Sequence, residues 1–202
     1  MLDKISWLGH SSIKIKTDKI IYIDPWKIKD EEKADLVLIS HNHGDHLSPS
    51  DVRKIQKNDT VIITTGDCAS QLQGDIRIVK PGDVINAHGV TVAATPSYNL
   101  SKSFHPKASG WIGFVITVEG KRIYYAGDTD FVPEMRDIKA DMMIMPVGGT
   151  YTMTAEEAAQ AVNFVKPKVA IPIHWGDIVG SATDAAKFKK LCQVLVTIKE
   201  AV

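Results

Sequence analysis

The stretch that decides the fold reads Asp35-Leu-Val-Leu-Ile39, followed after one serine by His41-Asn-His-Gly-Asp-His46. A short apolar run of this kind is typical of a buried strand. Side chains alternate in an extended segment, so the ligands at positions 41, 43 and 45 can point the same way, and a turn at Gly44 can bring His46 round to join them. Imidazole and carboxylate groups are ordinary ligands of zinc and related cations. The spacing predicts a metal site after a strand and suits two metals better than one.

Length and composition describe a chain of modest size without a strong charge. Of its 202 residues 44% are hydrophobic, which is enough for one sizeable core, so we expect a single domain over 1–202. Basic and acidic residues balance at 24 each, so the chain has no overall positive charge that would attract nucleic acid or an acidic membrane. We therefore expect a small-molecule substrate as the partner. The sequence does not determine the oligomeric state.

The cysteines and the first residues of the chain predict where in the cell the protein is found. Cys68 and Cys192 are far apart and do not form a paired spacing, which argues against a disulfide framework. The first residues lack the apolar core of a signal peptide, and no apolar run approaches the roughly 20 residues of a membrane span. We expect a cytoplasmic protein with no membrane partner.

The chain resembles itself at an offset of 104 to 106 residues. Residues 7–24 and 111–128 both read as strand, turn and strand, and both end in an aspartate. Residues 33–39 match 139–145, and a helix start follows each, at Ser48 and Thr154. Such a repeat predicts a duplicated unit, although chance pairing of common strand patterns is the alternative. Two halves of this kind predict a mixed α/β (α+β) fold with two packed sheets and helices outside.

Local patterns place the remaining elements. Ser48-Pro49 and Thr154-Ala-Glu-Glu157 are helix starts, so we expect helices over 48–57 and 154–165, and a third over 181–192. β-branched runs bounded by turn residues predict strands at 60–64, 76–79, 90–95, 168–173 and 194–198. Residues 99–110 read as a long polar loop.

The second half contains further candidate ligands at the ends of predicted strands. Asp128 follows the run that ends at Tyr125, and its carboxylate has two oxygens that can bridge two cations. His174 follows the run that ends at Ile173. Alone, each has an ordinary structural explanation, as a turn former or as a packed histidine. Together with the 41–46 motif they predict one shared site, because loops on a rigid scaffold carry most sites.

The whole pattern resembles the metallo-β-lactamase superfamily of hydrolases. The motifs that carry the resemblance are Asp24, the run His41–His46, Gly127-Asp128 and His174, in the family's order. Trp7-Leu-Gly-His10, Pro146-Val-Gly-Gly149 and Pro172-Ile-His-Trp175 are similar to the branch that contains ascorbate-6-phosphate lactonase and N-acyl phosphatidylethanolamine phospholipase D. The resemblance implies a four-layer αββα sandwich of two similar halves.

The resemblance also implies a ligand set for two divalent metals, zinc in the first place, with manganese or iron as alternatives. His41 and His43 would bind the first metal, Asp45, His46 and His174 the second, and Asp128 would bridge them. The third histidine of the first metal is missing where the family places it, because Tyr98 stands there. His105, seven residues further along, is the candidate replacement, and His88 is the rival.

Four residues receive weaker predictions. His10 is either a packed, hydrogen-bonded histidine or a group beside the metals. Asp24 is expected to hydrogen-bond a metal-bound histidine and fix its tautomer. Tyr98, Tyr151 and His10 are candidate donors to a developing oxyanion, with ordinary packing as the alternative.

The predicted function is metal-dependent hydrolysis. Hydroxide bridging two divalent metals, formed as the pKa of water falls from about 15.7 towards 7, would attack a carbonyl carbon or a phosphorus, and Asp45 would orient it. The chain has no room for the inserted domain of nuclease members, so a small ester, lactone or phosphodiester is expected, and the lactonase branch favours a lactone or sugar phosphate. The alternative is a metal-binding regulatory protein without turnover. A membrane-associated phospholipase is disfavoured because no basic amphipathic helix is visible.

Overall fold

Two β-sheets contain most of the regular structure in a computed structural model, which describes residues 1–29 and 32–202. The N-terminal sheet has the strand order β1-β2-β3-β4-β5-β6, with bounds β1 (Ile5–Gly9), β2 (Ser12–Lys16), β3 (Ile20–Ile23), β4 (Leu36–Leu38), β5 (Val61–Thr64) and β6 (Asp75–Ile78). The C-terminal sheet has the order β13-β12-β11-β10-β9-β8-β7, with bounds β7 (Val84–Ala87), β8 (Val90–Pro96), β9 (Ile112–Val118), β10 (Lys121–Tyr125), β11 (Met142–Pro146), β12 (Val169–Ile173) and β13 (Leu195–Val196).

The two sheets repeat one topology. β1, β2 and β3 are antiparallel neighbours, and β3 to β6 are parallel; β8, β9 and β10 are likewise antiparallel, and β10 to β13 are parallel. Helices follow equivalent strands: α1 (Pro49–Ile55) follows β4 as α3 (Ala155–Val165) follows β11, and α2 (Gly66–Ala69) follows β5 as α4 (Ala182–Leu191) follows β12. This is the arrangement that a duplicated unit predicts. Residues 7–24 contain the end of β1 as well as β2 and β3, one strand more than their predicted match at 111–128.

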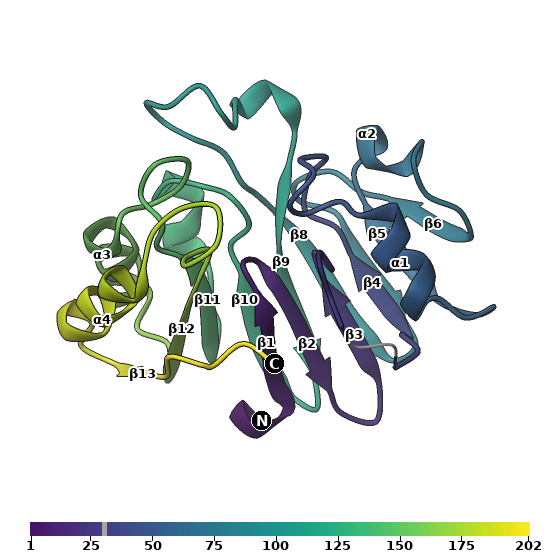
Figure 1. The fold of residues 1–202 in the computed structure, drawn as a ribbon, viewed down its shortest axis with the longest axis horizontal. Coiled ribbons are helices and arrows are strands. Elements are labelled where there is room, and N and C mark those ends of the chain that lie inside the picture. The colour runs from purple at the N-terminus through teal and green to yellow at the C-terminus, as the bar shows by residue number, and fades with distance from the viewer. Residues whose placement is uncertain (30–31) are drawn as a thin grey trace.

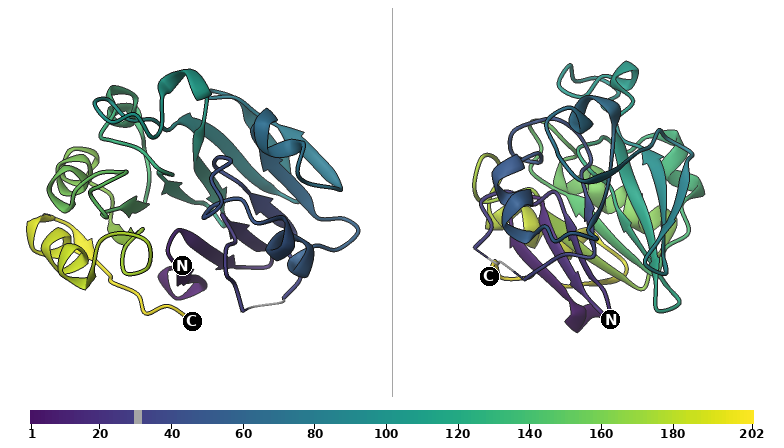
Figure 2. Two further views of the ribbon diagram at one scale, coloured as in Figure 1. Left: turned by 45° about the horizontal axis from the view of Figure 1, so that its top comes forward. Right: turned by 90° about the vertical axis from the view of Figure 1, so that its right-hand side faces the viewer.

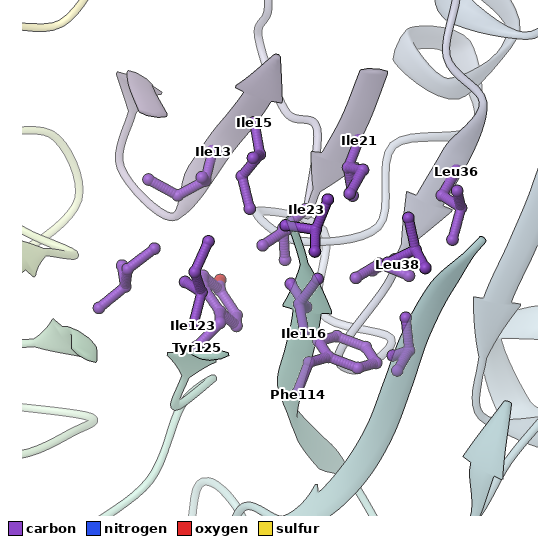
Figure 3. Packing of buried hydrophobic residues seen from close by; sticks show 14 of the residues in the cluster. Ile13, Ile15, Ile21, Ile23, Leu36, Leu38, Phe114, Ile116, Ile123 and Tyr125 are labelled. Carbon is purple, nitrogen blue, oxygen red and sulfur yellow. The ribbon is translucent and has the colours of Figure 1, made fainter. Parts of the chain in front are cut away.

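The central core lies between the sheets and is built from alternate residues of each strand. Ile13, Ile15, Ile21, Ile23, Leu36 and Leu38 of the N-terminal sheet face Phe114, Ile116, Ile123 and Tyr125 of the C-terminal sheet (Figure 3). Each such aliphatic side chain is almost fully buried and contributes about 1.5–3 kcal/mol through the hydrophobic effect. The period of two in the sequence therefore becomes the inner face of a sandwich.

The intervening residues of the same strands point outward and meet the helices. Tyr22, Val37 and Ile62 pack with Val52 and Ile55 of α1 in one outer cluster. Tyr124, Met143 and Ala170 pack in the other with residues of α3 and α4, among them Ala158, Val162 and Phe188. In Figures 1 and 2, α1 and α2 lie beside the N-terminal sheet, and α3 and α4 lie beside the C-terminal sheet. Three apolar interfaces separate four layers, which is the predicted αββα sandwich.

Local signals place the helix starts where the sequence predicts them. Ser48 Oγ accepts from the Asp51 amide at 3.3 Å, with Pro49 in the first turn. Thr154 and Glu157 form a reciprocal capping box, with the Thr154 amide donating to Glu157 Oε2 at 2.8 Å. α4 begins after Ser181, whose amide donates to Asp184 Oδ2 at 2.8 Å.

The last predicted strand is shorter than expected. Only Leu195 and Val196 pair with β12, whereas the sequence predicted a strand over 194–198. The chain then leaves this sheet edge and reaches β1 of the other sheet, where the Val202 amide donates to the Trp7 carbonyl at 3.1 Å. Among the helices of the described ranges, none is both long and apolar enough to cross a membrane.

Three short 3-10 segments complete the description of the fold. η1 (Leu2–Lys4), η2 (Lys107–Ser109) and η3 (Pro133–Asp137) are single 3-10 turns or little more. The loop that contains η2, between β8 and β9, projects at the top of the molecule in Figure 1. It rises from the same edge at which the candidate site lies.

Candidate metal centre

The candidate ligands follow strands of both sheets. His10 follows β1, the 41–46 motif follows β4, His105 lies between β8 and β9, Asp128 follows β10 and His174 follows β12. His10 and His174 have φ angles of 46° and 60°, in the left-handed region that non-glycine residues rarely adopt. The His174 amide donates to the His10 carbonyl at 2.9 Å, which ties the two loops together. Residues far apart in the sequence therefore converge on one edge of the sandwich.

The 41–46 motif turns back on itself as the spacing predicted. The amides of His46 and Leu47 both donate to the His43 carbonyl, at 3.0 and 2.8 Å. This tight turn directs the His46 ring towards the same centre as His41, and the two ring centroids lie 4.0 Å apart. Four ligands drawn from six residues are thus compatible with one compact site.

Three histidines form the first cluster. One ring nitrogen from each of His41, His43 and His105 lies within 4.8 Å of the others. His41 Nε2 and His43 Nδ1 are 3.1 Å apart, a separation that two ligands of one cation can adopt. The fold therefore brings His105, from the long loop, to the pair from the motif.

Asn99 holds His105 in place from the beginning of that loop. Its side-chain Oδ1 accepts from the backbone amide of His105 at 3.1 Å and from His105 Nδ1 at 3.0 Å. The second bond leaves Nε2 of His105 free to face the cluster. Asn99 Nδ2 in turn donates to Asp130 Oδ1 and to the Tyr151 carbonyl, both at 3.0 Å. Sequence reasoning missed Asn99 and Asp130, and an asparagine at the start of a polar loop gave only a weak signal.

Four groups form the second cluster, in which ligand atoms of His10, Asp45, His46 and His174 lie within 4.8 Å of one another. His46 Nδ1 donates to Asp24 Oδ2 at 2.8 Å, which directs His46 Nε2 into the cluster. Asp24 is itself fully buried and accepts from the Ser40 amide at 2.7 Å and from the Tyr125 hydroxyl at 2.7 Å. The model thus places Asp24 behind a candidate ligand, as the sequence predicted.

Asp128 lies between the two clusters. Its Oδ2 is 3.3 Å from His105 Nε2 and 3.1 Å from His174 Nε2, and its Oδ1 is 3.3 Å from His46 Nε2. One carboxylate therefore contacts a histidine of the first cluster and two of the second. That is the position a bridging ligand requires.

The donor set fits divalent cations because it leaves buried ring nitrogens without partners. Nε2 of His46, His105 and His174, and Oδ1 of Asp128, are buried and make no hydrogen bond. An unsatisfied buried polar atom costs about 1–3 kcal/mol, so four around one point call for an explanation. A cation ligated by imidazole and carboxylate supplies it. The residues present thus fit metals that the family implies.

Electrostatics keep His41 and His43 in the form that binds metal. Burial, reinforced by neighbouring histidines, lowers the pKa of His41 well below 6.5 and that of His43 below the same value. Both rings are therefore neutral at neutral pH, and a neutral imidazole has a free lone pair. His46 differs: burial opposes protonation, but Asp128 and Asp24 outweigh it and raise the pKa of His46 well above 6.5. Metal binding at His46 would therefore release a proton.

The carboxylates are ionised. Burial opposes ionisation of Asp128, but the adjacent His174 and His46 outweigh it and hold its pKa well below 3.8. Burial also opposes ionisation of Asp45, but the hydrogen bond with His10 and the charge of His46 lower the pKa of Asp45 to about 2. His10 Nε2 lies 3.0 Å from Asp45 Oδ2. His10 is thus hydrogen-bonded and also one of the four groups of the second cluster, so both alternatives that the sequence left open describe it.

Three other residues that the sequence singled out belong to neither ligand cluster. Tyr98 packs in the outer cluster of the C-terminal sheet, and its hydroxyl donates to Glu134 at 2.9 Å, away from the histidines. His88 Nε2 is 2.9 Å from the Asp59 carbonyl and belongs to neither cluster. Tyr151 lines the cavity beside the ligands.

The glycine pair at 148 and 149 serves packing. A side chain at Gly148 would collide with the His174 carbonyl, so glycine is required for the two loops to approach. The amides of Gly149 and Thr150 donate to Met153 and Gly148 at 3.0 Å each. These amides are therefore not available to a phosphate.

Comparison with known proteins agrees with this geometry. A family model described as the β-lactamase superfamily domain matches residues 4–174. A UPF0173 metal-dependent hydrolase of Thermoplasma acidophilum is 34% identical over 210 aligned positions, which cover 96% of this chain and 92% of that protein.

Two solved structures are similar over nearly the whole chain. The crystal structure of a candidate metal-dependent hydrolase from Parabacteroides distasonis has 33% identity and a TM-score of 0.88, and the match covers 98% of this chain and 93% of that one. Igni18, a metallo hydrolase of Ignicoccus hospitalis, has 26% identity and a TM-score of 0.81, with 98% and 94% covered. Fold and site therefore define a metal-dependent hydrolase with the metallo-β-lactamase fold. Within that superfamily, the chain belongs to the UPF0173 metal-dependent hydrolases.

Proposed function

We propose that the chain hydrolyses a small ester, lactone or phosphodiester with the help of two divalent cations. The observation that carries this proposal is the set of buried, unpaired ring nitrogens around Asp128. His41, His43 and His105 would hold one cation, Asp45, His46 and His174 the other, and Asp128 both. When bound, such cations acidify water and polarise the oxygen on which negative charge develops. Zinc suits this donor set, and manganese and iron are the alternatives.

The chain's own residues would orient the reacting groups. In ester hydrolysis the water oxygen bonds to the acyl carbon, the bond from that carbon to the alcohol oxygen breaks, and the alcohol oxygen takes a proton. Asp45 is ionised, partly exposed and lines the cavity, so it can accept a hydrogen bond from the water and relay a proton to the leaving oxygen. The bond from His10 fixes the Asp45 carboxylate for that task.

The test combines metal analysis with activity. Protein stripped by a chelator and reloaded with zinc, manganese or iron is expected to bind two ions per chain and to gain activity on a panel of esters, lactones and phosphodiesters. His41→Ala should lower both, and His88→Ala, which changes a histidine outside the clusters, should leave both unchanged.

The outcomes separate the alternatives. Less than one ion per chain, unchanged in His41→Ala, would overturn the two-metal site. Two ions without turnover of any substrate would favour the metal-binding regulatory protein instead.

Two broader predictions accompany this proposal. A reducing, cytoplasmic location is supported by the free thiols of Cys68 and Cys192. A single domain over 1–202 is supported by the central core, which contains residues of both halves. The similarity to the lactonase branch stays a prediction that the substrate panel addresses.

A further inference from the structure

A small cavity opens directly onto the candidate ligands. It has a volume of about 200 Å³ and is lined by His43, Asp45, His105 and Asp128 together with Phe104, Tyr151 and Ile178. This is below the roughly 300–1,000 Å³ of sites for drug-sized ligands. The candidate ligands form a polar floor, and Phe104, Tyr151 and Ile178 form apolar walls. The volume suits a compact molecule.

The apolar walls come from three separate loops. Phe104 belongs to the loop that carries His105, Tyr151 follows β11, and Ile178 lies shortly after His174. Phe104 and Ile178 are 45% and 47% exposed, although both are large hydrophobic side chains. Single exposed apolar residues are common, but two that converge with the partly exposed Tyr151 ring on one cavity beside a site indicate a surface for an apolar ligand group.

These walls are held in position. The Phe104 and Tyr151 rings meet edge to face, with centroids 4.7 Å apart and planes at 90°. The Tyr151 carbonyl accepts from Asn99 Nδ2, so the residue that holds His105 also holds this wall. The Gly176 amide donates to the Val179 carbonyl at 3.1 Å, which closes the turn that presents Ile178. A wall fixed to the ligand-bearing loops can position a substrate relative to the reacting atoms.

Apart from the proposed cations on its floor, the cavity has no cationic side chain for an anionic substituent: among the described residues that line it there is neither lysine nor arginine. Lysines of the surrounding loops are engaged elsewhere: Lys102 with Asp130 at 2.6 Å, Lys107 with Glu134 at 2.8 Å and Lys27 with Asp177 at 3.2 Å. A phosphate or carboxylate away from the scissile bond would meet apolar walls without a partner, which is costly.

We propose that the substrate is a small ester or lactone whose apolar substituent packs on Phe104, Tyr151 and Ile178, and that it carries no phosphate or carboxylate away from the scissile bond. This rests on the proposed hydrolytic function and narrows it. The reaction adds one water across the acyl carbon–oxygen bond, giving a carboxylic acid and an alcohol.

A matched set of substrates tests the proposal on the metal-loaded chain. p-Nitrophenyl butyrate is uncharged, mono-p-nitrophenyl succinate carries a carboxylate at the end of an acyl chain of the same length, and bis-p-nitrophenyl phosphate is an anionic phosphodiester with the same leaving group. We expect kcat/KM for the butyrate to exceed that for either anion by at least about tenfold.

Substitutions of the cavity-wall residues provide the second part of the test. Phe104→Ala and Ile178→Ala should raise KM for the butyrate by about tenfold with little change in kcat, and should leave the succinate nearly unaffected. Leu100→Ala is the matched control, because Leu100 is a 60% exposed apolar residue of the same loop that does not line the cavity. Calorimetric titration with the ketone in which a methylene replaces the ester oxygen should give the same ranking of variants without turnover.

The outcomes distinguish the two proposals. Equal or faster turnover of either anion, or wall variants that behave like Leu100→Ala, would overturn the apolar substrate class while hydrolysis itself stands. Turnover of none of the three substrates, with two metals bound and no ketone binding, would overturn the proposed function and the substrate class with it.

Discussion

Replacement of Asn99 by alanine tests how the first cluster is held together. The Asn99 side chain is buried, accepts twice from His105 at 3.0 and 3.1 Å, and donates to Asp130 and to the Tyr151 carbonyl at 3.0 Å each. Asn99→Ala removes all four hydrogen bonds and leaves their partners unsatisfied in a buried region. His105 loses the bond that directs its Nε2 towards His41 and His43.

Two effects of different size follow. A typical hydrogen bond contributes about 1 kcal/mol net, so we expect the free energy of unfolding of the metal-free protein to fall by about 3–5 kcal/mol. Loss of an outer partner of a metal-binding histidine weakens metal affinity by roughly 10- to 100-fold. Because Asn99 contacts a ligand of the first cluster only, the second metal should be affected much less.

The assay is a titration of metal against a competing chelator, with urea denaturation of the same samples. Asn86→Ala is the control, because Asn86 is an exposed asparagine whose Oδ1 accepts from Thr91 at 2.6 Å, outside both clusters. Asn99→Asp keeps an acceptor for His105 and should recover most of the lost affinity if the chain folds. Equal weakening of both metals, or unchanged affinity in Asn99→Ala, would refute this account of how His105 is positioned.

Three further changes address the rest of the molecule. Asp24→Asn removes the charge that orients His46 and should lower affinity for the second metal by roughly 10- to 100-fold, measured by the same titration; an unchanged value would count against its role. Phe188→Ala empties a fully buried position under α4 and should lower the free energy of unfolding by about 3–5 kcal/mol in urea, with no effect on metal stoichiometry. Burial opposes ionisation of Asp51, but hydrogen bonds from Lys54 and its neighbours lower its pKa below 3.8, so its stabilisation is present above 3.8 and is lost as pH falls through the lower folded value. Asp51→Asn should therefore flatten the dependence of the urea midpoint on pH in that acidic window, and a parallel curve would argue against it.

Much of the fold is visible in the sequence because it depends on neighbours along the chain. Alternation in Ile21-Tyr-Ile23 assigns Tyr22 to one face and both isoleucines to the other. The caps at Ser48 and Thr154 satisfy backbone amides within three residues. The 41–46 motif is equally local, since its own turn brings its ligands to the two adjoining clusters.

Other features required the tertiary structure. Tyr98 and His105 lie in the same stretch, and only the path of the loop decides that Tyr98 packs in the outer cluster while His105 reaches the histidines. The role of Asn99 depends on two partners more than thirty residues away, the Asp130 carboxylate and the Tyr151 carbonyl. Strand 194–198 was predicted too long because the chain departs to β1 of the opposite sheet.

The sequence alone therefore determined which residues are candidate metal ligands, because groups of the right type are packed into one run and repeated strands imply where their partners lie. It also determined the layers, since the period of two and the helix caps act over short range. Only the tertiary structure decided which histidine completes the first cluster and what surrounds the reacting atoms. The physical reason is that Phe104, Tyr151 and Ile178 come from three loops whose meeting depends on how the whole sandwich packs.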